Sequence, residues 1–415
     1  MKLMMKTSNF RIWTFALAFA FNAAMNAQSF APGNLAVLRL GDGTQTLLNS
    51  GNTVFLDQYS TNGVLVNSNA LPDSGTNALL VSGTASSEGG LSRTLDRTAM
   101  VIAGYNTNRG SVTGSLANTT GTAVPRGVVT VNATGAYVLA QTSTAVYSAN
   151  NIRGGAGDGS NNFWTAGANT GTFYLNPPNP PVTIQSTIAN TRYIKAIAGN
   201  LYFSTQAGTP GIYTFQGGGL PKAGATTSLL FGTGASSQAA GFDINPSLTV
   251  AYVADQRNTA GGIQKWTNNA GAWGLAYTFA TGAGAFAVAA DFSGAAPMVY
   301  ATTGESVSNR LVCINDTNAS ATVNFLATAG SNRWFRGIDF APVAAPSAPS
   351  LAIQLSGTNV VVSWPEAATG YTLQNIMSLG PNDWSGMTNV PVTANGSNTV
   401  SVPASGAQQF FRLKQ

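Results

Sequence analysis

The sequence contains no histidine, one cysteine and few charged residues, which make up 8% of its 415 positions. Without histidine there is no Ser-His-Asp or Cys-His catalysis and no histidine-based zinc or copper site. Cys313 alone forms no intrachain disulfide and no thiolate metal centre. Its neighbours Leu311, Val312 and Ile314 are apolar, which predicts a buried, inert thiol. We therefore expect no metal ion and no cofactor.

The low charge is combined with 44% apolar residues and 47 glycines. Solubility must then come from Ser, Thr, Asn and Gln, a profile typical of an extracellular β-protein rather than a disordered chain. The length allows one large domain and one small one.

The N-terminus has the pattern of a secretory signal peptide. Basic residues precede an apolar run from Ile12 to Phe21, and small residues follow from Ala23 to Ala27. The run is about 10 residues, too short for the ~20 that a membrane-spanning helix needs. We expect residues 1–27 to be removed after Ala27, giving a secreted or cell-surface protein without a membrane span. The alternative, a buried N-terminal helix, fits the basic flank less well.

The formal charge of +5 also depends on this leader. Once the basic residues of the leader are set aside, only a small positive excess is left, and the remaining Lys and Arg are scattered. No basic stripe is present to neutralise a phosphate backbone, so nucleic acid is not expected as a partner.

A repeated unit organises the chain between about residues 92 and 342. Each copy has a short apolar run, a turn at Asp, Asn or Gly, and a second run that often opens on Tyr. Most copies follow one another at the ~40–50 residues of a four-stranded propeller blade. One step, from Asn132 to Asp158, is too short, so seven blades are favoured and six remain open. The landmark residues are Asp96, Asn132, Asp158, Gly199, Asp243, Asp291 and Asp339.

The two ends of this repeat region are incomplete in complementary ways. Phe335–Phe340 has the pattern of an innermost strand, but Pro342 and a Pro/Ala-rich segment follow it. Near the N-terminus, strands expected within residues 35–66 lack an inner partner. Pairing the two ends completes one blade and removes the open edges of a linear array. The sequence therefore predicts an all-β fold with a closed β-propeller over residues 28–342, rather than a β-helix.

A second domain is expected at the C-terminus. Prolines in and around residues 343–349 predict a stiff linker. Beyond it, Leu351, Ile353 and Leu355 alternate with other residues, the pattern of a strand with one face inward. Residues 350–415 are predicted to form one small β-sandwich.

Two resemblances add to this interpretation. The tail resembles the fibronectin type III-like modules of secreted bacterial proteins, through residues 362–365, 370–374 and 409–413. The larger region resembles a family of uncharacterised secreted bacterial β-propellers, from which no activity or ligand can be transferred. The motifs that carry this second resemblance are Leu40–Thr44, Val54–Tyr59, Ser87–Gly89, Ala103–Tyr105 and Phe335–Gly337.

Carboxylates are the catalytic groups that remain, because a glycosidase needs only two of them beside a sugar bond. Asp243, Asp291 and Asp339 recur at one position of the repeat, which favours a structural Asp that accepts backbone N–H groups at a turn.

Residues that do not recur are better candidates for contacting a ligand. They are the acids Glu88, Asp255 and Glu305, and the aromatic residues Trp164 and Trp334, whose rings could stack on a sugar. For the tryptophans, packing between blades is the favoured alternative.

The sequence favours a secreted, monomeric, non-catalytic binding protein that recognises an extracellular polysaccharide or protein through its propeller loops. Two alternatives remain: a carboxylate-dependent glycoside hydrolase or lyase, and a structural cell-surface protein. Two carboxylates about 5–10 Å apart in a polar pocket would favour the hydrolase.

Overall fold

The computed structural model describes residues 27–306, 308–345, 349–368, 370–378, 384–404 and 408–414. Within these ranges the chain forms strands β1 to β32 and one 3-10 turn, η1 (Leu116–Asn118), with no α-helix. The predicted all-β class is therefore confirmed. No helix in this described part is long and apolar enough to cross a membrane. The chain divides into two compact units, with the boundary between Ala344 and Ala345.

The first unit contains six groups of four antiparallel strands among its described residues, which we call blades 1 to 6. Blades 1 and 2 are joined by the short strand β4 (Leu80–Val81), which pairs with a strand of each. The blades, with the innermost strand first, are as follows. Blade 1 is β25 (Trp334–Phe340), β1 (Leu35–Leu40), β2 (Asn52–Tyr59) and β3 (Leu65–Ala70); blade 2 is β5 (Leu91–Arg93), β6 (Ala99–Tyr105), β7 (Arg126–Asn132) and β8 (Tyr137–Ser143); blade 3 is β9 (Ile152–Gly157), β10 (Phe163–Gly167), β11 (Thr172–Leu175) and β12 (Val182–Gln185); blade 4 is β13 (Thr191–Ile197), β14 (Asn200–Thr205), β15 (Gly211–Phe215) and β16 (Thr227–Gly232); blade 5 is β17 (Ala239–Ile244), β18 (Val250–Asp255), β19 (Gly262–Asn269) and β20 (Ala272–Phe279); blade 6 is β21 (Ala285–Asp291), β22 (Met298–Thr303), β23 (Arg310–Asn315) and β24 (Asn324–Thr328).

Strand burial follows position within the blade. The inner strands are buried on both faces, as in β21, whereas the outermost strand β20 exposes most of its residues. Large apolar side chains fill the space between blades; for example, the ring of Phe231 in blade 4 stacks on Trp266 in blade 5 at 4.9 Å. Nearer the axis the backbones approach closely, and a Cβ at Gly241 would lie 2.6 Å from the Cα of Ala287. Glycine is the residue that allows this approach.

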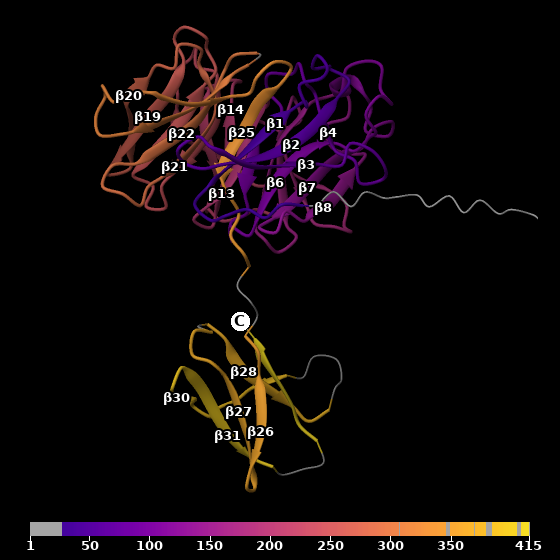
Figure 1. Cartoon of the computed structure of the whole chain (residues 1–415), viewed down its shortest axis with the longest axis vertical. Helices are drawn as coiled ribbons and strands as arrows, with labels where there is room; N and C mark the ends of the chain where they lie inside the picture. Colours follow the sequence, from indigo (N-terminus) through magenta and orange to yellow (C-terminus); the bar gives the residue numbers. More distant parts are fainter. Residues whose placement is uncertain are drawn as a thin grey trace, which may run out of the picture. The chain divides into compact units, whose positions relative to one another are not determined.

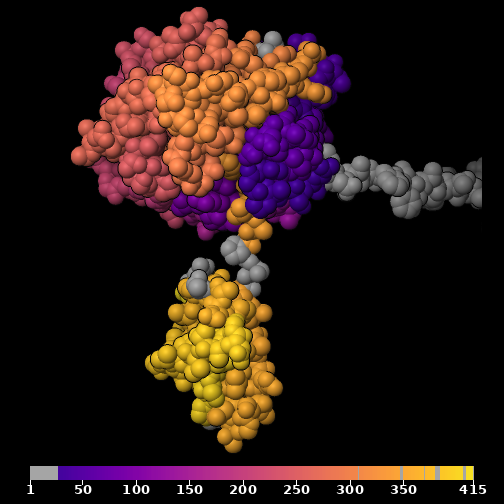
Figure 2. Space-filling view, turned by 60° about the vertical axis from the view of Figure 1, so that its left-hand side comes forward, coloured from indigo at the N-terminus to yellow at the C-terminus, as the bar shows by residue number. Residues whose placement is uncertain are grey.

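The ring closes through the last strand of the unit. Strand β25 pairs with β1, with Leu35 opposite Phe340 and Val37 opposite Ile338. The inner strands contact one another in the order β25, β5, β9, β13, β17, β21 and back to β25. Figures 1 and 2 show the orange C-terminal part of this unit beside its indigo N-terminal strands. The predicted pairing of the Phe335–Phe340 segment with the N-terminal strands is confirmed.

The favoured count of seven blades is wrong, because the described part of the ring has six. Asn132 lies at the end of β7, in the outer hairpin of the same blade whose inner turn carries Asp96. An insertion over residues 106–125, between β6 and β7, lengthens blade 2. The β7–β8 hairpin of blade 2 therefore lies at the sequence position where a separate copy of the repeat is expected.

The second unit consists of two sheets. One has the order β26-β27-β31-β30 and the other β29-β28-β32. Val362, Trp364, Leu373, Val400 and Val402 form its buried core. Both sheets contribute to this core, which makes the unit a small β-sandwich. Its strands are β26 (Ala352–Ser356), β27 (Asn359–Pro365), β28 (Thr372–Ile376), β29 (Ser385–Gly386), β30 (Val392–Ala394), β31 (Ser397–Pro403) and β32 (Phe410–Lys414).

Candidate functional site

A cavity of about 150 Å³ lies at one mouth of the central channel, where the inner strands of the blades end. Five charged residues from four blades line it: Arg93 from β5, Arg97 from the turn after β5, Lys195 from β13, Asp243 from β17 and Asp339 from β25. An adjoining hollow of about 470 Å³ shares Arg93 and several other lining residues with the cavity. We refer to the two together as the mouth hollow.

Lys195 is buried between two carboxylates at the base of the mouth hollow. Its Nζ lies 3.0 Å from Oδ2 of Asp339 and 3.7 Å from Oδ1 of Asp243. The side chain of Lys195 is 5% exposed, that of Asp339 8% and that of Asp243 16%. The cluster is therefore a desolvated ion-pair network in which Lys195 is the common cation.

Each carboxylate is also held by backbone N–H groups from two blades. Asp243 accepts from Ile244 on its own strand and from Ala290 of blade 6 at 3.0 Å. Asp339 accepts from Phe340 on its own strand and from Arg93 of blade 2 at 3.2 Å. The structural role favoured for these repeated Asp residues is thus observed, and it links neighbouring blades.

The third repeated acid has the turn role that the sequence favours. Asp291 is exposed and accepts the backbone N–H of Ser293 within its own turn at 2.9 Å. It lines the outer part of the mouth hollow.

The two buried acids have opposite pKa shifts. Burial and the like charge of Asp339 raise the pKa of Asp243, against the opposing effect of Lys195. For Asp339, burial acts to raise the pKa, but Lys195 and Arg93 together hold it below its usual value. Burial acts to lower the pKa of Lys195, yet its two acidic neighbours keep that pKa above the ordinary lysine value. Lys195 is therefore protonated at neutral pH.

The mouth hollow combines hydrogen-bond donors with aromatic walls. An ammonium group has three N–H donors, and Lys195 makes one hydrogen bond and one longer ion contact. Arg97, which is exposed, adds a second donor, and Phe292 and Phe340 contribute partly exposed rings. Cationic donors beside aromatic faces can hold a polyhydroxylated ligand, with its oxygens on the donors and its C–H groups against the rings.

Two aromatic rings from different blades meet near the channel axis. The rings of Tyr193 in blade 4 and Phe286 in blade 6 meet edge to face at 6.1 Å, and the Tyr193 hydroxyl accepts the backbone N–H of Leu91 in blade 2. Groups from three blades can meet in this way only near the axis.

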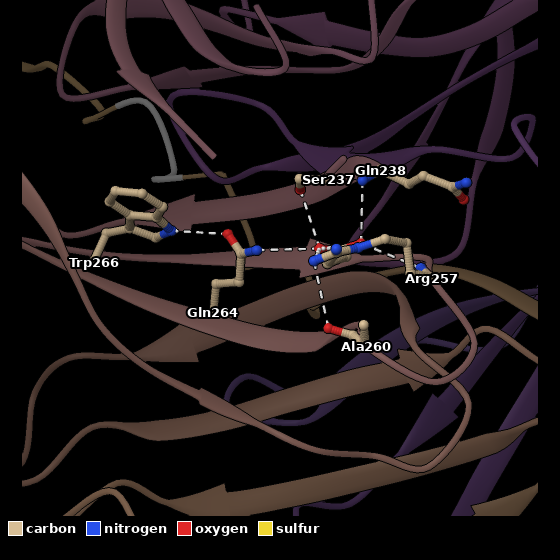
Figure 3. A network of polar contacts seen from close by, with 7 residues as sticks. Ser237, Gln238, Arg257, Ala260, Gln264 and Trp266 are labelled. Carbon is tan, nitrogen blue, oxygen red and sulfur yellow. Dashed lines mark hydrogen bonds and ion pairs between the residues drawn. The ribbon is translucent and has the colours of Figure 1, made fainter. Parts of the chain in front are cut away.

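Asp255, one of the acids predicted to contact a ligand, is 0% exposed. Figure 3 shows Ser237, Gln238, Arg257 and Gln264, which converge on its carboxylate. Asp255 accepts hydrogen bonds from Ser237 Oγ at 3.1 Å, from the backbone N–H of Gln238 at 3.1 Å and from Gln264 Nε2 at 3.1 Å. Arg257 donates to it from Nη2 at 2.6 Å and from Nε. With its acceptor positions occupied by the protein, Asp255 fixes two loops of blade 5.

Glu88 and Glu305 lie in different settings. Glu88 is 1% exposed and accepts from the backbone N–H of Ser82 at 3.0 Å, from Tyr105 Oη at 2.8 Å and from Asn151 Nδ2 at 2.5 Å. Burial raises the pKa of Glu88. The side chain of Glu305 is 29% exposed and pairs with Arg310 at 2.6 Å.

Trp164 and Trp334 are both in the core. Trp164 is 0% exposed, and its Nε1 donates to the carbonyl of Pro221 at 2.6 Å. Trp334 is 5% exposed, and the guanidinium carbon of Arg336 lies 3.3 Å from the centroid of its ring. Neither tryptophan lines the mouth hollow.

The five residues predicted to contact a ligand are therefore not brought together, and none of them lines the mouth hollow. Sequence reasoning missed Lys195 and Arg93. A signal for Lys195 was present, because it interrupts the apolar inner strand Tyr193–Ile197 with a charge. A charged residue in a strand buried on both faces needs partners, and here Asp243 and Asp339 provide them.

The geometry defines the class of the first unit, a six-bladed β-propeller closed by pairing of its two ends, with a polar hollow at one mouth of its channel. Within the described residues no group of three or more acidic or cysteine side chains is placed to hold a metal ion.

Comparisons with known proteins do not identify a family for this chain. No protein-family model matches the chain, and no curated protein matches it. Among solved structures, a chain of a nidogen/laminin complex is 11% identical, with a TM-score of 0.49 over 75% of this chain and 99% of that one. TolB from Acinetobacter baumannii is 13% identical, with a TM-score of 0.48 over 75% and 67%. A gluconolactonase from Xanthomonas campestris is 10% identical, with a TM-score of 0.40 over 80% and 94%. At these values no ligand or activity is transferred.

Proposed function

We propose that this chain is a secreted, monomeric carbohydrate-binding protein whose site is the mouth hollow. The observation that carries the proposal is the buried cation Lys195, which keeps unused donor capacity at the base of a cavity of about 150 Å³. Sugar hydroxyls are good acceptors for such donors, and Phe292 and Phe340 offer apolar faces for the sugar ring. An extracellular polysaccharide fits this chemistry better than a protein surface, because the hollow is concave.

Glycoside hydrolysis is the competing function, since the carboxylates of Asp243 and Asp339 lie within about 7 Å of each other and have opposite pKa shifts. In a hydrolase the space between the two carboxyl groups holds the sugar bond or the attacking water. Here Lys195 Nζ contacts both carboxylates. This arrangement supports binding rather than bond cleavage.

The proposal is tested by measuring saccharide binding to the mature protein and to the Arg97→Gln variant. Wild type is screened against a broad panel of soluble oligosaccharides, and the best ligand is titrated by calorimetry, with released reducing sugar measured in parallel. Because Arg97 is exposed, its replacement should leave the fold intact and weaken binding about tenfold, the effect of losing one charge-assisted hydrogen bond.

Lys222→Gln is the matched control, since Lys222 is also an exposed cation and is not among the residues that line the mouth hollow. Equal affinity in Arg97→Gln and wild type would remove the site from the mouth hollow. Released sugar would favour the hydrolase. Neither binding nor release across the panel would favour a structural role at the cell surface.

Secretion is the second part of the proposal. In the structure Gln28 is anchored by its own backbone, because its N–H donates to Asn69 Oδ1 at 2.8 Å and its carbonyl accepts from Asn69 Nδ2 at 2.8 Å. A chain cut after Ala27 keeps these contacts and loses only residues that precede them. We expect N-terminal sequencing of protein collected from the medium or the cell surface to begin at Gln28. An intact leader on the exported protein would contradict this.

We further propose that the C-terminal unit, residues 350–415, is a fibronectin type III-like spacer or attachment module. Its own core, centred on Trp364 and Leu373, supports independent folding. Such a module would keep the propeller at a distance from the surface that carries it.

A further inference from the structure

Three inner strands each carry an arginine near the end opposite to the mouth hollow. They are Arg153 of β9, Arg192 of β13 and Arg336 of β25, and we call them the arginine cluster. Arg336 is 0% exposed and Arg153 6%, whereas Arg192 is half-buried. None of the three lines the mouth hollow.

Arg336 points toward the channel axis. Its guanidinium carbon lies 3.3 Å from the ring centroid of Trp334 and 5.3 Å from that of Phe286, the ring that meets Tyr193 across the channel. Its Nη2 donates to the carbonyl of Ala85 at 2.7 Å. Its Nε and Nη1 are buried and have no hydrogen-bond partner in the described part of the chain.

The other two arginines are also incompletely paired. Nη1 of Arg153 donates to Asn190 Oδ1 at 2.6 Å and to the carbonyl of Thr191 at 3.1 Å, but its Nε has no partner among the described residues. The buried Nε of Arg192 has none there either. A guanidinium carries five N–H donors and no acceptor, so the cluster has many more donors than the surrounding chain satisfies.

No carboxylate neutralises the cluster directly. Among the described residues, none of the three arginines belongs to an ion pair. The charge of Glu88 acts on Arg153 and Arg336, but its carboxylate accepts from Ser82, Tyr105 and Asn151 instead. The three arginines therefore carry more buried positive charge than Glu88 can balance.

Burying a cation without a counter-charge is unfavourable. Burial lowers the pKa of Arg336 to about 9 and that of Arg153 to about 10, so both are still protonated at neutral pH. A ligand that brings negative charge and several oxygen acceptors would remove this cost and use the free donors. Planar guanidinium groups match such oxygens in pairs.

We propose that the arginine cluster is a binding site for a small oxyanion, such as phosphate or a carboxylate, on the axis of the propeller. This site is independent of the carbohydrate site at the mouth hollow. Loops at the same ends of the inner strands are joined by polar contacts: Gln256 Nε2 donates to the carbonyl of Ser86 at 2.8 Å, and Gln206 Nε2 donates to Gln256 Oε1 at 3.0 Å. These contacts are exposed or partly buried, so we expect an ion to enter between these loops.

The test uses the full mature protein, with phosphate and acetate as separate probes. Thermal unfolding and calorimetric binding are followed as each anion replaces chloride at constant ionic strength. Phosphate stabilises folded proteins in general by exclusion from their surface, and that effect does not saturate. We expect wild type to show an additional, saturable rise in Tm with one or both anions, and the effective anion identifies the kind of oxyanion.

Arg336→Met and Arg192→Gln are expected to lose the saturable part or to require at least about tenfold more anion. Arg192 is half-buried, so Arg192→Gln decides the question if Arg336→Met does not fold. Lys222→Gln should respond as wild type does. The proposal is overturned if neither anion gives a saturable response, or if the response is unchanged in both arginine variants.

Discussion

Replacing Lys195 with methionine is expected to lower the free energy of unfolding at neutral pH by about 3–5 kcal/mol. The change removes the common cation of two buried carboxylates, Asp243 and Asp339, and leaves them facing each other. Methionine keeps most of the apolar stem of lysine, so lost packing contributes little. Urea unfolding of both proteins gives the difference directly.

The pH dependence of this variant should distinguish electrostatics from packing. In wild type Lys195 contributes stability below its ordinary pKa, and that contribution is lost as pH rises through its raised folded pKa. Asp339, with a lowered pKa, contributes stability above its ordinary value, and that contribution is lost as pH falls through the folded pKa. Asp243 has a raised pKa and acts in the opposite direction.

Without Lys195 both carboxyl groups are expected to have raised pKa values, because burial and mutual repulsion then act unopposed. A folded state that binds protons more tightly than the unfolded state gains stability as pH falls. Lys195→Met should therefore become more stable, relative to wild type, between about pH 7 and pH 5.

Two further variants complete this experiment. Adding Asp243→Asn to Lys195→Met removes one of the two facing charges and should recover part of the lost stability. Lys222→Met removes an exposed lysine and should change stability by less than about 0.5 kcal/mol. A loss in Lys195→Met that is independent of pH would mean that packing, not charge, explains the role of Lys195.

A chain that stops after Arg333 is expected not to fold cooperatively, whereas one that stops after Ala344 should unfold like the intact first unit. The shorter chain lacks β25, and with it the buried side chains of Phe335 and Ile338. Losses of about 3–5 kcal/mol for each large core side chain approach the ~5–15 kcal/mol that stabilise a typical domain. The longer chain loses only the second unit, which has a separate core.

Circular dichroism and urea unfolding of the two truncated proteins provide the measurement. A sharp unfolding transition in the chain ending at Arg333 would show that the remaining blades are stable without closure. Loss of the transition in the chain ending at Ala344 would show that the first unit depends on the second.

The ring could be predicted because its signals are local. Alternating apolar runs and turn residues mark each hairpin, and the unpartnered segments at the two ends indicated their pairing. The blade count could not be predicted in the same way. The hairpin of β7 and β8 has the pattern of an inner hairpin, and only its pairing with β6 shows that it belongs to blade 2.

The candidate site was harder to predict, because its residues come from separate blades. The site forms because Lys195, Asp243 and Asp339 each lie near the end of an inner strand. The repeat predicts the position of each residue along the channel axis, but it does not predict the direction of the side chain. Conversely, Asp255 does not recur in the repeat and was expected to contact a ligand. Two loops instead converge on it with enough donors to occupy its carboxylate.

The pairing of β25 with β1 also determines when the chain can fold. The partners are separated by roughly 300 residues, and contacts this remote in sequence form slowly. During synthesis β1 has no inner partner until nearly the whole first unit has been made, so the completed ring forms late. Under the secretion proposed above, late ring closure would favour a chain that is exported before it folds and gains its stability afterwards.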